Sequence, residues 1–340
     1  MRFIELVKNR LLIKVNLEPG RDILELLGNQ DSNLKLVENH LDVEIFVLGD
    51  KIEIEGEEEA TIIASEVISE LIKQVSQGQE LDVDTVLRTI DAIEAKDEYS
   101  PHQLYNDSIL TYRGKIIRPK TPGQKRYIDA IRKNTLVFAI GPAGTGKTYL
   151  AMAMAVSALS NKEISRIILV RPVVEAGEKL GFLPGDLYEK VDPYLRPLYD
   201  ALFEMMGAEQ FHSLMDRGII EVAPLAYMRG RTLNDSFIIL DEAQNTSPEQ
   251  MKMFLTRLGF GSKAVVTGDV TQIDLPEGKF SGLKTVAGIL NDLDDIEFCY
   301  LDSRDVVRHR LVQKIVNAYK LYEEKGKGSA IKRKNENLAK

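Results

Sequence analysis

Residues 141–148 fit the phosphate-binding loop pattern G-x-x-x-x-G-K-[ST]. The apolar stretch 136–140 precedes them, and a helix-forming run follows from Tyr149. A strand, a glycine-rich turn and a helix in this order direct backbone N–H groups and the positive end of the helix dipole at one point. We expect Lys147 to reach the β- and γ-phosphates and the Thr148 hydroxyl to hold Mg²⁺, so the pattern predicts binding of a nucleoside triphosphate such as ATP. The expected loop residues are Gly141, Pro142, Ala143, Gly144, Thr145, Gly146, Lys147 and Thr148.

An acidic pair follows a second apolar run further along the chain. Residues 237–240 are all apolar and lead directly into Asp241 and Glu242. Four apolar residues are typical of a buried parallel strand, and ligands bind at the carboxyl ends of such strands. We therefore expect Asp241 to support Mg²⁺ and Glu242 to orient or deprotonate the attacking water, as a hydrolase requires.

Two glutamines extend this set. Gln272 comes shortly after a third predicted strand, 264–267, where its amide is placed to contact the γ-phosphate or the attacking water. Gln124 opens the helix that leads to the loop-bearing strand, where a bidentate amide pair would read the edge of an adenine. Each signal is weak alone, but together with the loop and the acidic pair they reproduce the nucleotide-site order of superfamily 1 helicases.

Several longer segments stand out: RPVVEAGEKLGFLPGD at 171–186, APLAYMRGRT at 223–232, ILDEAQNT at 239–246 and DVVRH at 305–309. They resemble the PhoH family. The resemblance covers nearly the whole chain; Arg310 is a departure, because the family more often has proline there. It implies a RecA-like ATPase with helicase-type motifs that forms a homo-oligomer, a hexameric ring, in RNA processing. It also implies partnership with the endoribonuclease YbeY.

The bulk properties are those of a globular chain long enough for two domains: 340 residues, of which 44% are apolar. No apolar run approaches the roughly 18 residues of a membrane span, and the start lacks the charge order of a signal peptide. With Cys299 as its single cysteine, the chain is expected to be soluble and cytoplasmic, without a membrane partner. Residues 1–100 carry a net charge of −13 and residues 101–340 a net charge of +5, so a polyanion such as single-stranded RNA should meet the C-terminal part.

The N-terminal region predicts a small α+β domain in the order β-α-α-β-β-α, which resembles a KH domain. In the position of the KH phosphate-gripping loop stands Gly28-Asn29-Gln30-Asp31, where an aspartate replaces the second glycine. A carboxylate would repel phosphate, so packing or oligomerisation is favoured over RNA binding here. The predicted domains are 1–78 (KH-like), 79–115 (helical connector), 116–322 (RecA-like ATPase with a mostly parallel sheet) and 323–340 (basic tail).

A single RecA-like module leaves one catalytic feature unexplained. Motors of this type close the site with an arginine from a second module, which this chain lacks. A neighbouring subunit would supply it, with Arg308 as the first candidate and Arg304 as the second, against the alternative of surface salt bridges. Three functions follow: an ATP-driven RNA motor, a nucleotide-switched adaptor that recruits a ribonuclease, and a P-loop kinase. Glu242 and Gln272 favour the first two, because a kinase needs neither.

Overall fold

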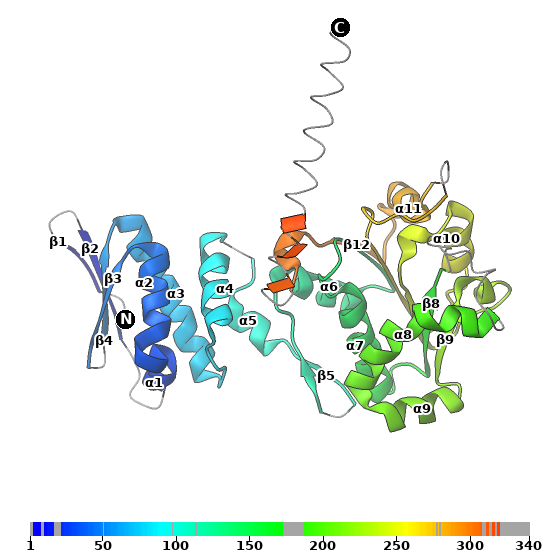
Figure 1. Cartoon of the computed structure of the whole chain (residues 1–340), viewed down its shortest axis with the longest axis horizontal. Helices are drawn as coiled ribbons and strands as arrows, with labels where there is room; N and C mark the ends of the chain where they lie inside the picture. The colour runs from blue at the N-terminus through cyan, green and yellow to red at the C-terminus, as the bar shows by residue number, and fades with distance from the viewer. Residues whose placement is uncertain are drawn as a thin grey trace, which may run out of the picture.

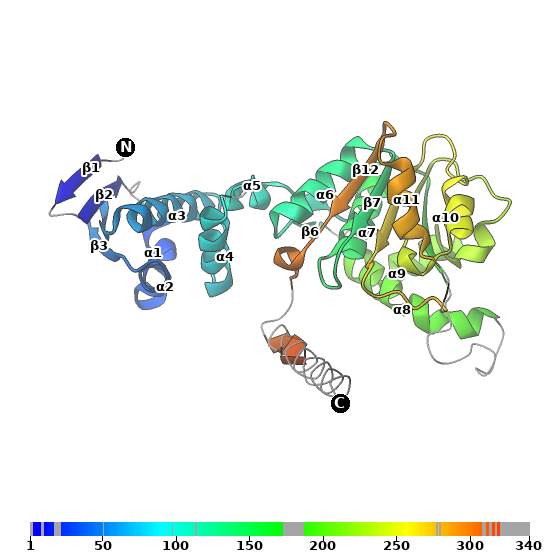
Figure 2. The same cartoon turned by 90° about the horizontal axis from the view of Figure 1, so that it is seen from above.

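The computed structural model describes residues 3–7, 10–16, 22–49, 51–96, 98–112, 114–172, 187–276, 278, 280–307, 311–312, 315–316 and 318–319. They form two lobes, with the short helix α5 (Pro101–Asn106) between them (Figures 1 and 2). The N-terminal lobe combines helices with an antiparallel sheet, whereas the C-terminal lobe is built on a parallel sheet. None of the helices in these residues has both the length and the apolar content needed to cross a bilayer.

The N-terminal lobe has the predicted order of strands and helices, preceded by one further strand. Its sheet has the order β1-β2-β4-β3 and is antiparallel throughout. Leu48 pairs with Lys51, which makes the turn at Gly49 a tight hairpin. The elements are β1 (Phe3–Val7), β2 (Arg10–Asn16), α1 (Asp22–Leu27), α2 (Ser32–Leu41), β3 (Glu44–Leu48), β4 (Lys51–Gly56), α3 (Glu58–Ser76) and α4 (Val83–Glu94).

Helix α4 belongs to the N-terminal core, although the sequence placed it in the connector. Val86 and Ile90 on this helix are fully buried against the same apolar cluster as Val67 and Ile68 of α3. At its far end the connector joins the other lobe, where β5 and β6 pair and Ile109 packs into the core of that lobe. The connector is therefore divided between the two lobes. Strand β5 (Ile109–Leu110) belongs to the connector, and its partner β6 (Ile116–Ile117) begins the next predicted domain.

The C-terminal lobe carries a six-stranded parallel sheet of order β12-β7-β11-β10-β8-β9. Five of these strands have the order β12-β7-β11-β10-β8, and the phosphate loop follows β7. This arrangement confirms the RecA-like α/β fold. The elements are α6 (Pro122–Lys133), β7 (Leu136–Ile140), α7 (Lys147–Ser160), β8 (Arg166–Arg171), α8 (Leu187–Met206), α9 (Ala208–Asp216), β9 (Ile220–Pro224), β10 (Ser236–Leu240), α10 (Pro248–Leu255), β11 (Lys263–Gly268), α11 (Gly282–Leu290) and β12 (Ile296–Tyr300).

The apolar strands are explained by burial of the sheet on both faces. All five residues of β7 are buried, and successive side chains point to opposite sides. Val137 and Ala139 pack in the cluster that includes α7 and α8. Phe138 and Ile140 pack in the cluster that includes α10 and α11. Because the strands are parallel, their carboxyl ends meet at one edge, and the candidate site residues follow those ends.

Candidate nucleotide-binding and hydrolysis site

The phosphate loop connects β7 to α7 as predicted. Two glycines give the loop its curvature, since Gly144 has φ 90° and Gly146 has φ 81°, in the left-handed region. Gly141 is required by close packing, because a Cβ there would lie 2.5 Å from the carbonyl oxygen of Leu301. Lys147 and Thr148 occupy the first turn of α7, a helix of 14 residues whose N-terminus faces the loop.

The Lys147 side chain lies inside the loop. Its Nζ donates to the carbonyl oxygens of Gly141 at 2.7 Å and Pro142 at 2.9 Å, and the residue is only 8% exposed. The ammonium is thus fixed among the backbone groups that would surround a phosphate. Nearby, burial favours the neutral form of Asp269, but hydrogen bonds from Thr271 and the charge of Lys147 outweigh this effect and lower the pKa of that carboxyl. Asp269 is therefore ionised at neutral pH and complements the lysine.

Thr148 and Asp241 meet at the predicted metal position. Thr148 Oγ1 donates to Asp241 Oδ1 at 2.7 Å, and Thr267 Oγ1 donates to the same oxygen at 2.7 Å. The three residues come from α7, the end of β10 and the end of β11, so the contact ties the loop to two neighbouring strands. A hydroxyl and a carboxylate oxygen side by side are the hard donors that Mg²⁺ prefers, and the residues present fit that ion.

Glu242 lies beside this pair and faces the same pocket. Its backbone has φ 53°, an uncommon left-handed conformation for a residue with a side chain. Oε1 accepts a hydrogen bond from Arg171 Nη2 at 3.1 Å and Oε2 accepts one from Gln244 Nε2 at 2.6 Å. The pocket has a volume of about 370 Å³; its walls include Thr148, Arg171, Asp241 and Glu242, together with Leu198 and Ala201 of α8.

Gln124 is buried against the phosphate loop. It is 4% exposed; its Nε2 donates to Thr145 O at 3.2 Å and its Oε1 accepts from the backbone N–H of Lys120 at 2.8 Å. The amide therefore links the start of α6 to the loop. Reading of an adenine by Gln124 stays a prediction.

Gln272 lies in the segment that follows β11. Its Nε2 donates to Asp269 Oδ2 at 2.7 Å, and its carbonyl oxygen accepts from Gln244 Nε2 at 3.2 Å. The side chain is exposed and its nearest described partner is a carboxylate, so a contact with the γ-phosphate or the attacking water stays a prediction.

The segment after β12 contacts the loop, which the sequence did not suggest. Asp305 is buried and accepts a hydrogen bond from Thr121 Oγ1 at 2.5 Å. A Cβ on Gly123 would collide with this carboxylate, so a larger residue there would displace the Asp305 side chain. Two residues later the N–H of Val307 donates to Gly144 O at 3.0 Å. Arg308, the predicted transition-state arginine, lies outside the described residues.

Other residues singled out from the sequence have ordinary roles. Arg304 pairs with Asp302, Nη2 to Oδ2, at 2.9 Å and its side chain is 74% exposed, which agrees with the surface salt-bridge alternative. Cys299 lies in β12, and burial raises the pKa of its thiol to about 12. A thiol of this kind is protonated at neutral pH, in agreement with a structural residue.

The glycine loop of the N-terminal lobe is closed by a neighbouring side chain. Asn33 is buried, and its Nδ2 donates to the carbonyl oxygens of Glu25 at 3.3 Å and Leu26 at 3.2 Å at the end of α1. Gly28 has φ 72°, and a Cβ there would meet the Asn33 side chain at 2.8 Å. Asp31 follows with φ 60°, at the position before α2.

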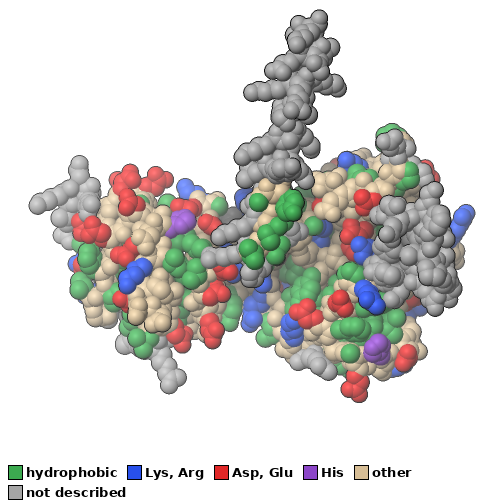
Figure 3. Space-filling model, viewed as in Figure 1, with side chains coloured by type: hydrophobic (Ala, Val, Ile, Leu, Met, Phe, Trp, Pro, Cys, Tyr) green, Lys and Arg blue, Asp and Glu red, His purple; other side chains and the backbone are tan. Residues whose placement is uncertain are grey.

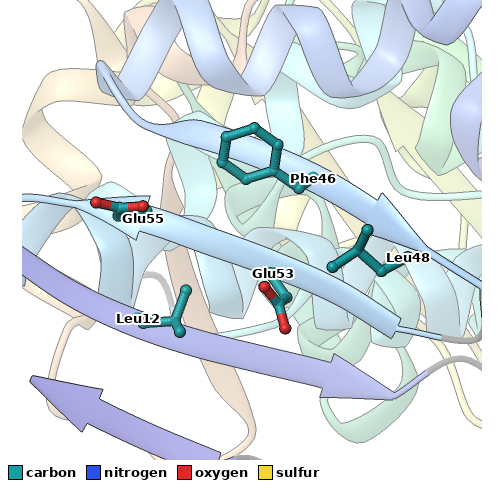
Figure 4. Close-up of a pocket in the computed structure, with 5 residues that line it drawn as sticks. All are labelled: Leu12, Phe46, Leu48, Glu53 and Glu55. Carbon is teal, nitrogen blue, oxygen red and sulfur yellow. The ribbon is translucent and has the colours of Figure 1, made fainter. Parts of the chain in front are cut away.

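The outer face of the N-terminal sheet has a shallow apolar hollow of about 290 Å³ with an acidic border. Figure 4 shows the apolar side chains of Leu12, Phe46 and Leu48 around it, with Glu53 and Glu55 beside them. On the face of the molecule in Figure 3, acidic side chains outnumber basic ones over this lobe. Neither feature favours a phosphate, in contrast to the loop of the other lobe.

Arg171, Gln244, Thr267 and Asp305 were absent from the predicted site residues. Arg171, Gln244 and Asp305 lie within the PhoH-like segments, so the resemblance contained a signal for them. Thr267 is the last residue of a predicted strand, and Asp241 directly follows another. The same position at a strand end could therefore have marked Thr267 as a candidate.

Comparison with known proteins identifies the family. The model of the PhoH-like protein family matches residues 116–320. A PhoH-like protein of Mycobacterium tuberculosis is 60% identical over 306 residues, 90% of this chain and 87% of the relative. One of Bacillus subtilis is 52% identical over 315 residues, 92% of this chain and 99% of the relative. Protein PhoH of Escherichia coli is 45% identical over 205 residues, 60% of this chain and 58% of the relative.

Among solved structures, the SWI2/SNF2 ATPase core of Sulfolobus solfataricus in complex with double-stranded DNA gives a TM-score of 0.30 at 14% identity, over 52% of this chain and 43% of that one. That likeness is too slight to carry an inference, so the fold assignment depends on the strand order and the loop. The family match covers the loop, the acidic pair and the strands that position them. This chain belongs to the PhoH family.

Proposed function

We propose that this chain is a Mg²⁺-dependent ATPase that remodels RNA. The observation that carries the proposal is the contact of Thr148 Oγ1 with Asp241 Oδ1 at 2.7 Å, with Glu242 next in the chain and facing the same pocket. This contact joins the end of the phosphate loop to Asp241 after β10, and it places the carboxylate of Glu242 beside the proposed metal position. The groups proposed to bind Mg²⁺ and to activate water therefore line one pocket, next to the phosphate loop.

Each residue of the site has its own role in the proposed reaction. The N–H groups of the loop and the Lys147 ammonium would hold the β- and γ-phosphates. Thr148 and Asp241 would hold Mg²⁺, which neutralises charge on the phosphates when bound. Glu242 would accept a hydrogen bond from the attacking water and orient it toward phosphorus. Asp305 and Gln124 act at a distance, by fixing the segments that pack against the loop.

The oligomeric and RNA-related parts of the proposal depend on charge and on the family. The positive net charge of residues 101–340 favours contact of single-stranded RNA with the C-terminal lobe. The described residues contain one RecA-like module, so we propose that a second copy completes the site, in a homo-oligomer, a hexameric ring, in which Arg308 acts on the neighbouring subunit. The endoribonuclease YbeY is the proposed partner, in the cytoplasm.

Strand displacement tests the motor function. An RNA duplex with a single-stranded extension, labelled on one strand, should release that strand only with ATP and Mg²⁺. Lys147→Ala provides the control, because it removes the loop charge and not a core contact. Release that is independent of ATP, or hydrolysis without any release, would contradict an unwinding motor.

A second function, a nucleotide-switched adaptor, is favoured by the N-terminal lobe. Its glycine loop is closed by Asn33 and followed by Asp31, which suits protein contact better than phosphate contact. Removing residues 1–96 deletes this lobe together with α4, which completes its core. The deletion should then abolish capture of the ribonuclease and change the affinity for RNA by no more than about twofold. ATP turnover by the shortened chain shows that the remaining lobe is folded. Loss of RNA binding instead would assign the RNA contact to this lobe.

A further inference from the structure

Arg171 and Glu242 are brought together by two neighbouring parallel strands. Arg171 is the last residue of β8, and Glu242 follows closely on the end of β10. Val170 pairs with Leu240 in the register of these strands, so their carboxyl ends lie level. Arg171 Nη2 then reaches Glu242 Oε1 at 3.1 Å, with 20% of the arginine side chain and 37% of the glutamate side chain exposed. The pair is partly shielded from water, unlike an ordinary surface salt bridge.

Gln244 holds the other carboxylate oxygen. Its Nε2 donates to Glu242 Oε2 at 2.6 Å, and the residue is 1% exposed. Its Oε1 accepts from the backbone N–H of Asp269 at 3.0 Å, which fixes the direction of the amide. Both carboxylate oxygens of Glu242 therefore accept a hydrogen bond. The charged donor is Arg171 on β8, and the buried neutral donor is Gln244 in the segment after β10.

The backbone conformation of Glu242 makes this support necessary. A residue with a side chain at φ 53° is held there by its surroundings, since the left-handed region is unfavourable for it. The orientation of a general base must be accurate, because a small displacement of the attacking water reduces the rate strongly. Two fixed donors supply that orientation.

We infer that Arg171 is a positioning residue for ATP hydrolysis, which directs the Glu242 carboxylate into the pocket beside Thr148 and Asp241. The inference depends on the proposed function, because Glu242 is the proposed base. Arg171 also lines this pocket, so direct contact of the guanidinium with a phosphate is the competing role, which the experiment below separates from positioning.

Steady-state ATP turnover of Arg171→Ala, Arg171→Lys and the wild type gives the first test. We expect Arg171→Ala to lower kcat by roughly ten- to a hundredfold with KM for ATP changed only slightly. Arg171→Lys should recover part of kcat, because an ammonium can still donate to Glu242 Oε1. Arg166→Ala is the matched control, because Arg166 begins the same strand and lies far from the pocket. Wild-type kcat in Arg171→Ala would overturn the inference.

A double-mutant cycle with Glu242→Gln, measured in single turnovers with radiolabelled ATP, gives the second test. If Arg171 acts through Glu242, adding Arg171→Ala to Glu242→Gln should cost little further rate. A full additional loss would show that Arg171 acts on the nucleotide directly, and would overturn the positioning role. Absence of turnover in the wild type would instead contradict the proposed function itself. If Arg171→Ala fails to fold in a thermal melt, the lysine variant carries both tests.

Discussion

Among the residues that the structure describes, glycine loops at 28–31 and 141–148 each precede a helix, and the two loops differ in the charge and the packing that a phosphate would meet. The loop at 141–148 leads into α7, a helix of 14 residues, and contains a lysine whose ammonium lies among its carbonyl oxygens. The loop at 28–31 leads into α2, a helix of 10 residues, and ends in an aspartate. Its space is filled by the Asn33 side chain.

The comparison shows that glycines alone do not make a phosphate site. In both loops a glycine with positive φ permits a tight turn, so the backbone requirement is shared. The two loops differ in the charge at the start of the helix and in the side chain that packs against the turn. Lys147 brings a cation to the N-terminus of α7, whereas Asp31 brings a carboxylate to that of α2. The first arrangement attracts a polyphosphate and the second repels it.

The largest effect is expected at the loop lysine. Lys147→Ala should reduce ATP hydrolysis to background, because the variant lacks the charge that faces the β- and γ-phosphates. The thermal melt should stay close to that of the wild type. Turnover is measured by phosphate release. Normal turnover in this variant would contradict the assignment of the loop at 141–148 as the triphosphate site.

A smaller loss is expected at Glu242, the carboxylate that we propose activates water. Glu242→Gln should keep the binding of Mg-ATP and lower hydrolysis on the order of a hundredfold, because an amide cannot accept a proton from water. Binding is followed with a fluorescent ATP analogue on the same sample. A variant that no longer binds would show that Glu242 has a structural or metal-binding role.

Arg308→Ala should lower hydrolysis by roughly tenfold or more while nucleotide binding is kept, as expected for loss of charge at the transition state. Mixed with Lys147→Ala, which still offers Arg308, it should recover part of the activity if the arginine acts on the neighbouring subunit. Val307 contacts Gly144 within one chain, so action within the same subunit is the competing outcome. A mixture no more active than its components, with mixed assembly confirmed by mass, would contradict the shared site.

The N-terminal loop should show a stability effect without a catalytic one. Asn33→Ala leaves the carbonyl oxygens at the end of α1 without their donor, which should lower the free energy of unfolding of this lobe by about 1–3 kcal/mol. ATP turnover should not change. Asn39→Ala is the control on the same helix, because that side chain makes an exposed hydrogen bond. Lost turnover in Asn33→Ala would show that the two lobes are coupled.

Local patterns predicted much of this structure because they follow from local physics. The alternation and apolar runs predicted three strands of the N-terminal sheet (β2, β3 and β4) and three of the C-terminal sheet (β7, β10 and β11), and the loop predicted the position of Lys147 and Thr148. The pairing of Arg171 with Glu242 depends on strand order, since β8 and β10 are neighbours only once the sheet is assembled. Asp305 is similar, because its partner Thr121 lies 184 residues away. Helix α4 was placed in the connector because amphipathic spacing does not say which core a helix will join.

The most direct test is the rate of ATP hydrolysis, with and without single-stranded RNA, on a sample whose oligomeric state is known from its mass in solution. The structure predicts Mg²⁺-dependent turnover that Lys147→Ala abolishes, and the proposed motor predicts that RNA raises the rate and that the gain falls steeply with salt. Turnover that RNA does not change would favour the adaptor. No turnover by the intact oligomer, with or without RNA, would contradict the assignment of Thr148, Asp241 and Glu242 to a hydrolysis site.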